Sequence, residues 1–187
     1  MTACPQSVFI FDEMDKMPEG VIDAIKPFID YHELIQGIDF RRSIFIFLSN
    51  TGGRQITHKA LEFWKQGLAR EDIQYSDLEE LIHLGAFNEV GGLHQSAVIE
   101  KSLIDHFVPF LPMEKEHIKK CAEMEAKLLN VNLTDAEMQS IANDMSYWPI
   151  TENIYSTTGC KRVAQKVDMI IEERLDEQRN HYISDNV

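Results

Sequence analysis

The chain has 187 residues, 31 of them acidic and 18 basic, so its formal net charge at pH 7 is −13. This charge excludes nucleic acid as the main partner, because binding a phosphate backbone requires a basic face. No apolar run of about 18 residues is present, so we expect no membrane span. Residues 1–5 do not resemble the start of a signal peptide, so we expect no signal sequence in this chain.

The first apolar run, Val8–Phe11, is followed directly by Asp12 and Glu13. An unbroken run of this length predicts a fully buried strand of a parallel sheet. Carboxylates after such a strand lie where open α/β sheets bind ligands. The pattern is that of a Walker B motif, in which the first carboxylate holds magnesium against nucleotide phosphates and the second activates the attacking water. Alone it is weakly specific, because many buried strands end in an acid.

A second run of the same design, Ser43–Leu48, ends in Ser49 and Asn50. Between the two runs, apolar residues at helical spacing predict a helix over residues 21–29 that Pro27 bends or ends. Strand, helix and strand in this order form a βαβ crossover, so we expect the two strands to be parallel.

The parallel arrangement would place Asn50 beside Asp12 and Glu13 at one edge of the sheet. There Asn50 can orient the same water or contact a terminal phosphate. The alternative is that Asn50 caps a turn formed with residues 51–53.

Further along, apolar spacing predicts an amphipathic helix over residues 56–64 that ends at Gly67. Residues 76–79 have the pattern of a capping box that opens a second helix. The pair at 91–92, Gly-Gly, predicts a surface loop. The aromatic and β-branched segment 107–110 predicts a short third strand, and its own proline favours an edge position.

After Pro112 the pattern is helical. Residues 114–129 predict a charged helix, and residues 134–137 form a capping box that opens another. Thr157 or Thr158 can cap a last helix that carries apolar residues from 163 to 175. The apolar stripe expected on the first of these helices consists of Ile118, Cys121, Met124 (or Glu125) and Leu128.

Three cysteines give no complete disulfide framework. Cys121 and Cys160 can pair and leave Cys4 over, whereas buried free thiols are the default in a reducing compartment. The triplet beginning at Asn132 is a glycosylation sequon, which is used only in a secretory compartment.

Five blocks occur along the chain in this order: Phe9–Met17, Ile22–Phe28, Phe45–Asn50, Leu103–Pro112 and Gly159–Lys161. They resemble the torsins, a branch of the AAA+ ATPases, and the resemblance extends over nearly all of the chain. It implies an α/β fold, with a partial AAA+ parallel sheet in residues 1–112 and a small all-helical lid in residues 113–187.

The resemblance also implies roles in ATP hydrolysis. Asp12 would organise magnesium, and Glu13 would polarise the hydrolytic water. Asn50 would be sensor 1, in contact with the nucleotide and the water. Lys161 would be sensor 2, reaching the phosphates of ATP, and its alternative is a solvated surface lysine.

The same resemblance implies a Cys121–Cys160 disulfide between lid helices. It places the protein in the endoplasmic reticulum lumen and nuclear envelope, as a homo-oligomer that remodels other proteins. It further implies a membrane-spanning activator whose luminal domain supplies an arginine finger in trans.

The sequence differs from the torsin pattern in one important respect. The 187 residues contain no Gly-x-x-x-x-Gly-Lys-Ser/Thr, the Walker A loop that cradles phosphates. We therefore expect the chain alone to be inactive. Its first half should be poorly soluble or only partly folded, because the missing strand leaves apolar edges.

Two alternatives to an ATPase stay open on the sequence. The first is an ATPase-incompetent remnant of a torsin that still binds partners. The second is an unrelated hydrolase with a metal site formed by Asp12, Glu13 and Asp15.

Overall fold

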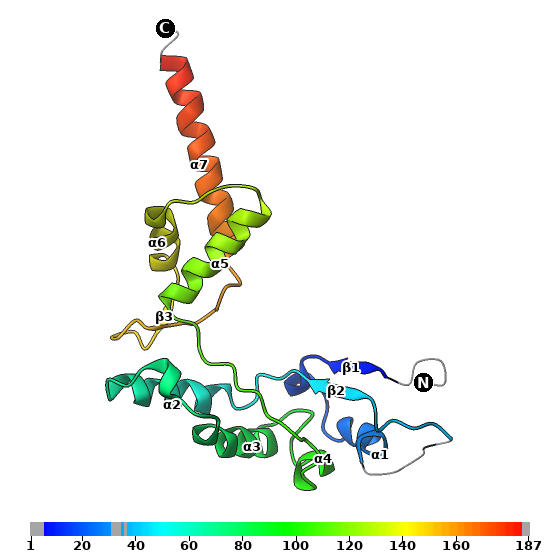
Figure 1. Ribbon diagram of the computed structural model, residues 1–187. Coiled ribbons are helices and arrows are strands. Elements are labelled where there is room, and N and C mark those ends of the chain that lie inside the picture. Colours follow the sequence, from blue (N-terminus) through cyan, green and yellow to red (C-terminus); the bar gives the residue numbers. More distant parts are fainter. Residues whose placement is uncertain (1–5, 31–34, 36, 185–187) are drawn as a thin grey trace. The chain divides into compact units, whose positions relative to one another are not determined.

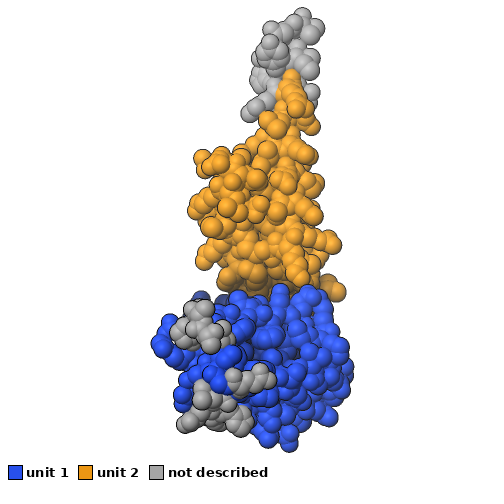
Figure 2. All heavy atoms as spheres, turned by 90° about the vertical axis from the view of Figure 1, so that its right-hand side faces the viewer, with its two compact units in different colours: residues 1–111 blue, residues 112–187 orange. Residues whose placement is uncertain are grey.

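The computed structural model describes residues 6–30, 35 and 37–184, so Cys4 lies outside the described residues. The chain forms two compact units, Met1–Leu111 and Pro112–Val187, which Figure 2 shows in different colours. The first unit is of the α/β class, and the second is mainly helical. None of the described helices combines the length and the apolarity that crossing a membrane requires.

The first unit contains the predicted parallel strands. Strand β1 (Val8–Phe11) pairs with β2 (Ile44–Phe47), and Val8 lies opposite Ile44 (Figure 1). The connection contains 3-10 helices at Met14–Lys16 and Ile22–Ile25 and the short helix α1 (Lys26–Ile29). Pro27 lies in the first turn of α1, where its missing N–H costs nothing, so it neither bends nor ends a longer helix.

The prediction that these strands are fully buried is wrong. Val8, Ile10 and Ile44 are about three-fifths exposed, at 58, 63 and 58%. The alternate side chains form the covered face, on which the Phe9 and Phe45 rings stack 5.1 Å apart. The two described strands thus have only one face on a core, and the expected poor solubility stays a prediction. That core comprises Met14, Ile22, Ala86, Leu93, Val98 and Ile99.

Three α-helices follow in the first unit: α2 (Gly53–Lys65), α3 (Glu79–Asn88) and α4 (Ala97–Glu100). Short 3-10 helices lie between α2 and α3 at Arg70–Asp72 and Tyr75–Asp77. Helix α2 confirms the predicted amphipathic helix, and Gly67 follows it with a φ of 73°. The capping box predicted at residues 76–79 is wrong. The Asp77 carboxylate instead accepts a hydrogen bond from the Gln74 N–H (2.8 Å) in a separate 3-10 turn, and α3 begins without a side-chain cap.

The third strand predicted at residues 107–110 is also wrong, since the described segment from Leu103 to Met113 contains no strand. Phe107 packs on the core, whereas Val108 and Phe110 are 73 and 83% exposed. The alternation of side chains is therefore present without a partner strand. Pro109 contributes to this outcome, because it has no N–H to donate to a neighbour.

The Gly91–Gly92 pair is buried, so the prediction of a surface loop is wrong. The Gly92 N–H donates to the Met14 carbonyl (2.9 Å). A Cβ on Gly92 would lie 2.8 Å from that carbonyl oxygen, and one on Gly91 would lie 2.7 Å from the Asp15 carbonyl oxygen. Only glycine allows this close approach to the chain that follows β1.

We expect Gly92→Ala to destabilise the first unit by about 1–3 kcal/mol, because backbone must move to admit the new methyl group. Urea unfolding, followed by Trp64 fluorescence in a Trp148→Phe background, measures this change. The matched control is Gly53→Ala in the first turn of α2, where a Cβ would meet nothing within 4 Å. Equal stability of the two variants would contradict the close packing at Gly92.

In the second unit, helices α5 (Lys115–Leu128), α6 (Asp135–Asn143) and α7 (Val163–Ser184) surround one core. Strands β3 (Tyr147–Trp148) and β4 (Tyr155–Ser156) pair antiparallel between α6 and α7, so the all-helical prediction is wrong here. Two-residue strands are too short to produce an alternating pattern. The buried core residues are Ile118, Ala122, Ala126, Ile141, Ala142, Met145, Tyr147, Val163 and Val167.

Helix α5 faces this core with Ile118 and the small residues Ala122 and Ala126. Met124 and Leu128, predicted to lie in the buried stripe, are instead 58 and 73% exposed. Alanines bring helix backbones close together, so the larger side chains are left at the margin. The sequence analysis placed Met124 and Leu128 in the apolar stripe only because these side chains are hydrophobic.

Capping was predicted correctly for α6 and incorrectly for α7. The Thr134 hydroxyl accepts from the Glu137 N–H (3.3 Å), and the Glu137 carboxylate accepts from the Thr134 N–H (2.7 Å). Helix α7 begins at Val163 after a turn, so neither Thr157 nor Thr158 directly precedes it. The Thr157 hydroxyl donates instead to the Ser146 carbonyl (3.2 Å).

Glu137 also links α6 to α7 through Arg174. The Arg174 Nε donates to one Glu137 oxygen (2.8 Å), and its Nη2 bonds the other. The Arg174 guanidinium, followed by Thr134, lowers the pKa of Glu137 to about 2. Because the folded pKa is depressed, this stabilisation is present above the unfolded value and is lost as pH falls toward 2.

We therefore expect the second unit to lose stability between pH 4.5 and pH 2.5, and Glu137→Gln to lose less over that interval. Urea unfolding at several pH values, followed by Trp148 fluorescence in a Trp64→Phe background, checks this. Glu116→Gln, at an exposed acid on α5, is the control. Parallel pH profiles for wild type and Glu137→Gln would contradict the assignment.

Candidate functional site

The candidate site lies where β1 and β2 end. Pairing continues past both strands, because the Leu48 N–H donates to the Phe11 carbonyl (2.8 Å) and the Met14 N–H donates to the Leu48 carbonyl (2.9 Å). Since the strands are parallel, the loops that follow them lie at the same edge of the sheet. Asp12, Glu13 and Asn50, which the sequence placed at one edge of the sheet, all lie in these two loops.

Asn50 is held by Asp15. The Asp15 carboxylate accepts from the Asn50 N–H (3.1 Å) and from Asn50 Nδ2 (3.3 and 3.4 Å). Ser49 Oγ lies 3.5 Å from the same carboxylate. The Asn50 N–H contributes most to lowering the pKa of Asp15, so this carboxylate is ionised near neutral pH.

The alternative in which Asn50 caps a turn applies only to its backbone. The Gly53 N–H donates to the Asn50 carbonyl (3.1 Å), while the side chain points to Asp15. The N-cap of α2 is Gly52, in the left-handed conformation with a φ of 76°. The side chain of Asn50 is thus available for a role other than capping the helix.

Asp12 and Glu13 are both exposed after β1. Asp12 Oδ1 accepts from the Glu13 N–H (2.8 Å), and the Glu13 carboxylate pairs with the Lys16 ammonium, which raises the pKa of Lys16. Glu13 has a φ of 53° and a ψ of 43°. A left-handed backbone at a residue other than glycine costs about 1–3 kcal/mol, and such strain gathers at functional sites.

Besides Asp15, the carboxylate of Glu89 at the end of α3 contacts the loop after β2. It accepts from the Gly52 N–H (3.2 Å) and from Gln55 Nε2 (3.0 Å) at the start of α2, where the helix dipole favours an anion. Sequence reasoning missed Glu89, and it considered Asp15 only as a metal ligand. No local signal marks Glu89, whereas Asp15 follows Asp12 at the spacing of one helical turn.

Within the described ranges, no three His, Cys, Asp or Glu side chains converge in a way that would hold a metal ion. This finding gives no support to a metal site formed by Asp12, Glu13 and Asp15. A magnesium ion bound through nucleotide phosphates needs only one or two carboxylates. The exposed Asp12 carboxylate, with one hydrogen bond to its own loop, fits that requirement.

Lys161 belongs to the second unit, in the turn before α7, and its side chain is exposed. Its N–H contacts the Thr158 carbonyl (3.3 Å). Asp12, Glu13 and Asn50 belong to the first unit.

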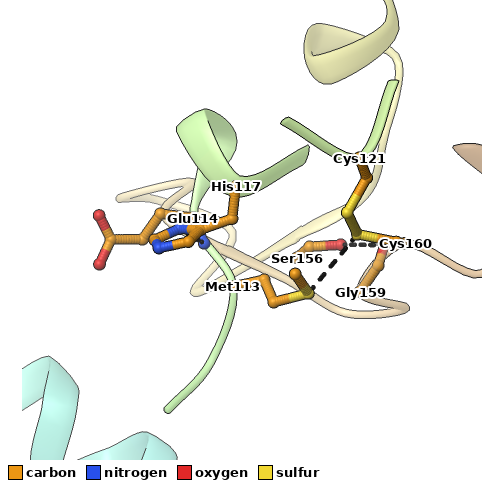
Figure 3. Close-up of a disulfide and its surroundings, with 7 residues drawn as sticks. All are labelled: Met113, Glu114, His117, Cys121, Ser156, Gly159 and Cys160. Carbon is orange, nitrogen blue, oxygen red and sulfur yellow. Dashed lines mark hydrogen bonds between the residues drawn. A yellow bond between two sulfur atoms is a disulfide. The ribbon is translucent and has the colours of Figure 1, made fainter. Parts of the chain in front are cut away.

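The neighbour of Lys161, Cys160, is bonded to Cys121 of α5, with an S–S distance of 1.94 Å and a Cα–Cα distance of 6.2 Å (Figure 3). This fits the pairing that the resemblance implies. Cys160 Sγ also lies 3.6 Å from Met113 Sδ. The bridge ties the turn that carries Lys161 to α5.

Asn132 lies in the exposed turn between α5 and α6. Its carbonyl accepts from Arg174 Nη1 (3.0 Å). Thr134, the third residue of the sequon, is the N-cap of α6. The turn is therefore ordered by contacts that leave the Asn132 side chain at the surface.

Comparison with known proteins identifies the family. The family described as "Torsin-1A, C-terminal domain" matches residues 113–170. A "Torsin-like protein" of Caenorhabditis elegans is 42% identical over 173 residues, which is 89% of this chain and 48% of the relative. A "Torsin-like protein" of Drosophila melanogaster is 42% identical over 175 residues, or 91% and 52%. The chain spans about half the length of these curated relatives. It belongs to the torsin family.

Proposed function

We propose that the protein acts as a torsin-like AAA+ ATPase that uses ATP binding and hydrolysis to remodel proteins in the endoplasmic reticulum lumen and nuclear envelope. The first unit is then part of the nucleotide-binding domain, and the second is its lid. The observation that carries the proposal is the strand-end arrangement, in which Asp12 and Glu13 follow β1 and Asn50 is fixed at the end of β2.

The residues of the chain take separate roles in this proposal. Magnesium supplies the positive charge that neutralises the phosphates, and Asp12 would hold it. Glu13 accepts a proton from the attacking water once its carboxylate leaves Lys16. Asn50 orients that water, and Lys161 contributes a cation from the lid.

Family membership also supports the proposed partners. A membrane-spanning activator would supply an arginine finger from its luminal domain, an effect worth about 10³–10⁵ in rate in other nucleotide hydrolases. We further propose that the protein forms a homo-oligomer.

The test joins two measurements on the endogenous protein, captured with an antibody to the second unit. Intact-mass measurement with fragment sequencing shows whether the natural chain exceeds 21.6 kDa and whether it carries a phosphate-binding loop. Magnesium-dependent ATP turnover then shows whether that chain is an enzyme. A 21.6 kDa chain that binds no nucleotide would overturn the proposal.

The same result would favour a second candidate, a partner-binding remnant without ATPase activity. The observation behind this candidate is that the 187 residues contain no Gly-x-x-x-x-Gly-Lys-Ser/Thr. Retention of activator binding by a chain that binds no ATP would establish it.

We expect Asn132 to carry an N-glycan when the protein is made in the secretory pathway, because its side chain lies at the surface of a turn. Asn132→Gln should abolish a mobility shift that a peptide N-glycosidase also removes. Thr134→Ser keeps the sequon and the helix cap, whereas Thr134→Asp keeps only the cap. An unshifted wild type, expressed with a leader, would contradict the modification.

A further inference from the structure

We propose that Asp15 is the positioning residue that fixes the Asn50 amide for ATP hydrolysis, without itself contacting the nucleotide. The inference rests on the proposed function and assigns a role to a carboxylate that the strand-end motif leaves unexplained. Asp15 acts through Asn50, so the effect of removing it should depend on whether Asn50 is present.

The hydrogen bonds define which way the amide points. An ionised carboxylate only accepts hydrogen bonds, so the Asn50 side chain must present its nitrogen to Asp15. The Asn50 Nδ2 lies 3.3 and 3.4 Å from the two Asp15 oxygens, and the Asn50 N–H donates to one of them at 3.1 Å. Asn50 Oδ1 is then left to accept a hydrogen bond from a water.

The other two acids at this edge are engaged differently. Asp12 accepts from the Glu13 N–H, and Glu13 pairs with Lys16. Of these three acids, Asp15 is the one that contacts the loop after β2 in the described residues, and its carboxylate also lies 3.5 Å from Ser49 Oγ. Its carboxylate thus joins the loop after β1 to the loop after β2.

The backbone that carries Asp15 is itself fixed. The preceding residue, Met14, is fully buried, and its N–H and carbonyl bond Leu48 and Gly92. The Gly91 backbone approaches Asp15 so closely that a Cβ would not fit. A carboxylate on such a support can hold a partner in one place, as precise positioning requires.

The experiment measures single-turnover ATP hydrolysis and the ATP dissociation constant in the full-length natural protein. Asp15→Asn, which replaces an acceptor-only group by an amide that bonds in either orientation, should slow hydrolysis about 10- to 100-fold with ATP affinity little changed. Asp15→Glu keeps the carboxylate and should recover part of the rate. Asp39→Asn removes a surface acid paired with Arg41 and is the charge-matched control.

The decisive variants combine Asp15→Asn with Asn50→Ala. If Asp15 acts through Asn50, the double variant should hydrolyse ATP at the rate of Asn50→Ala alone, because residues that act as a unit are not additive. A further slowing by the full factor of Asp15→Asn would overturn the inference. So would a wild-type rate in the single Asp15→Asn variant.

Failure of the proposed function has a different signature. A wild-type protein that hydrolyses no ATP removes that function, and with it the positioning role of Asp15 in hydrolysis. Nuclear magnetic resonance of the Asn50 side-chain NH₂ then reports the contact directly. Asp15→Asn should shift those signals, and unchanged signals would overturn the contact itself.

Discussion

Glu13→Gln is expected to lower ATP hydrolysis by the full-length protein about 10²- to 10⁴-fold, the usual contribution of a general base. ATP binding should persist, because Glu13 is proposed to act on the water and Asp12 on the magnesium ion. The amide has nearly the shape of the carboxylate, so the first unit should keep its fold. Turnover assays and equilibrium binding of ATP separate the two effects.

The control for this experiment is Glu71→Gln, at an exposed acid in a 3-10 helix of the same unit. It changes the net charge equally, and its turnover should match wild type. Loss of ATP binding in Glu13→Gln would contradict the proposed division of roles. Retained turnover would remove Glu13 as the base.

Removing the Cys121–Cys160 disulfide is expected to cost the second unit about 3–4 kcal/mol in the chain-entropy account. The bridge spans a sequence separation of 39, and reduction frees that loop in the unfolded state. Urea unfolding with Trp148 as the reporter, in a Trp64→Phe background, measures the difference. Reductant should bring wild type to the stability of the double Cys→Ser variant.

Two controls keep this result specific. Reductant should not affect the double variant, and Cys4→Ser should behave as wild type. Equal urea midpoints for the oxidised and the reduced wild type would contradict the expectation that the disulfide stabilises the second unit. A reduced protein that retains its midpoint but loses ATP affinity would instead assign the bridge a purely functional role near Lys161.

Much of the secondary structure followed from local patterns. The apolar runs predicted the parallel pair β1 and β2, and Thr134 with Glu137 predicted the start of α6 correctly. These signals lie within a few residues of the feature that they specify. The third strand failed because side-chain alternation in Phe107–Phe110 reflects packing on a core and carries no information on a partner strand.

The candidate site was predictable only in part for the same reason. Apolar strands followed by acids pointed to Asp12 and Glu13, but Asp15 and Glu89 owe their positions to contacts across the unit. The burial of Gly91 also depends on such a contact. In sequence, a glycine required by close packing looks the same as a glycine required by a turn.

The contact between Gly91 and Asp15 has a consequence for the order in which the protein is made. At about 5–20 residues per second, a ribosome adds Gly91 about 4–15 s after Asp15. The loop after β1 is thus synthesised before the end of α3, and it can close only after that segment has been added. Throughout this interval the nascent strands have no finished core, so chaperone contact with them should be concentrated in that window.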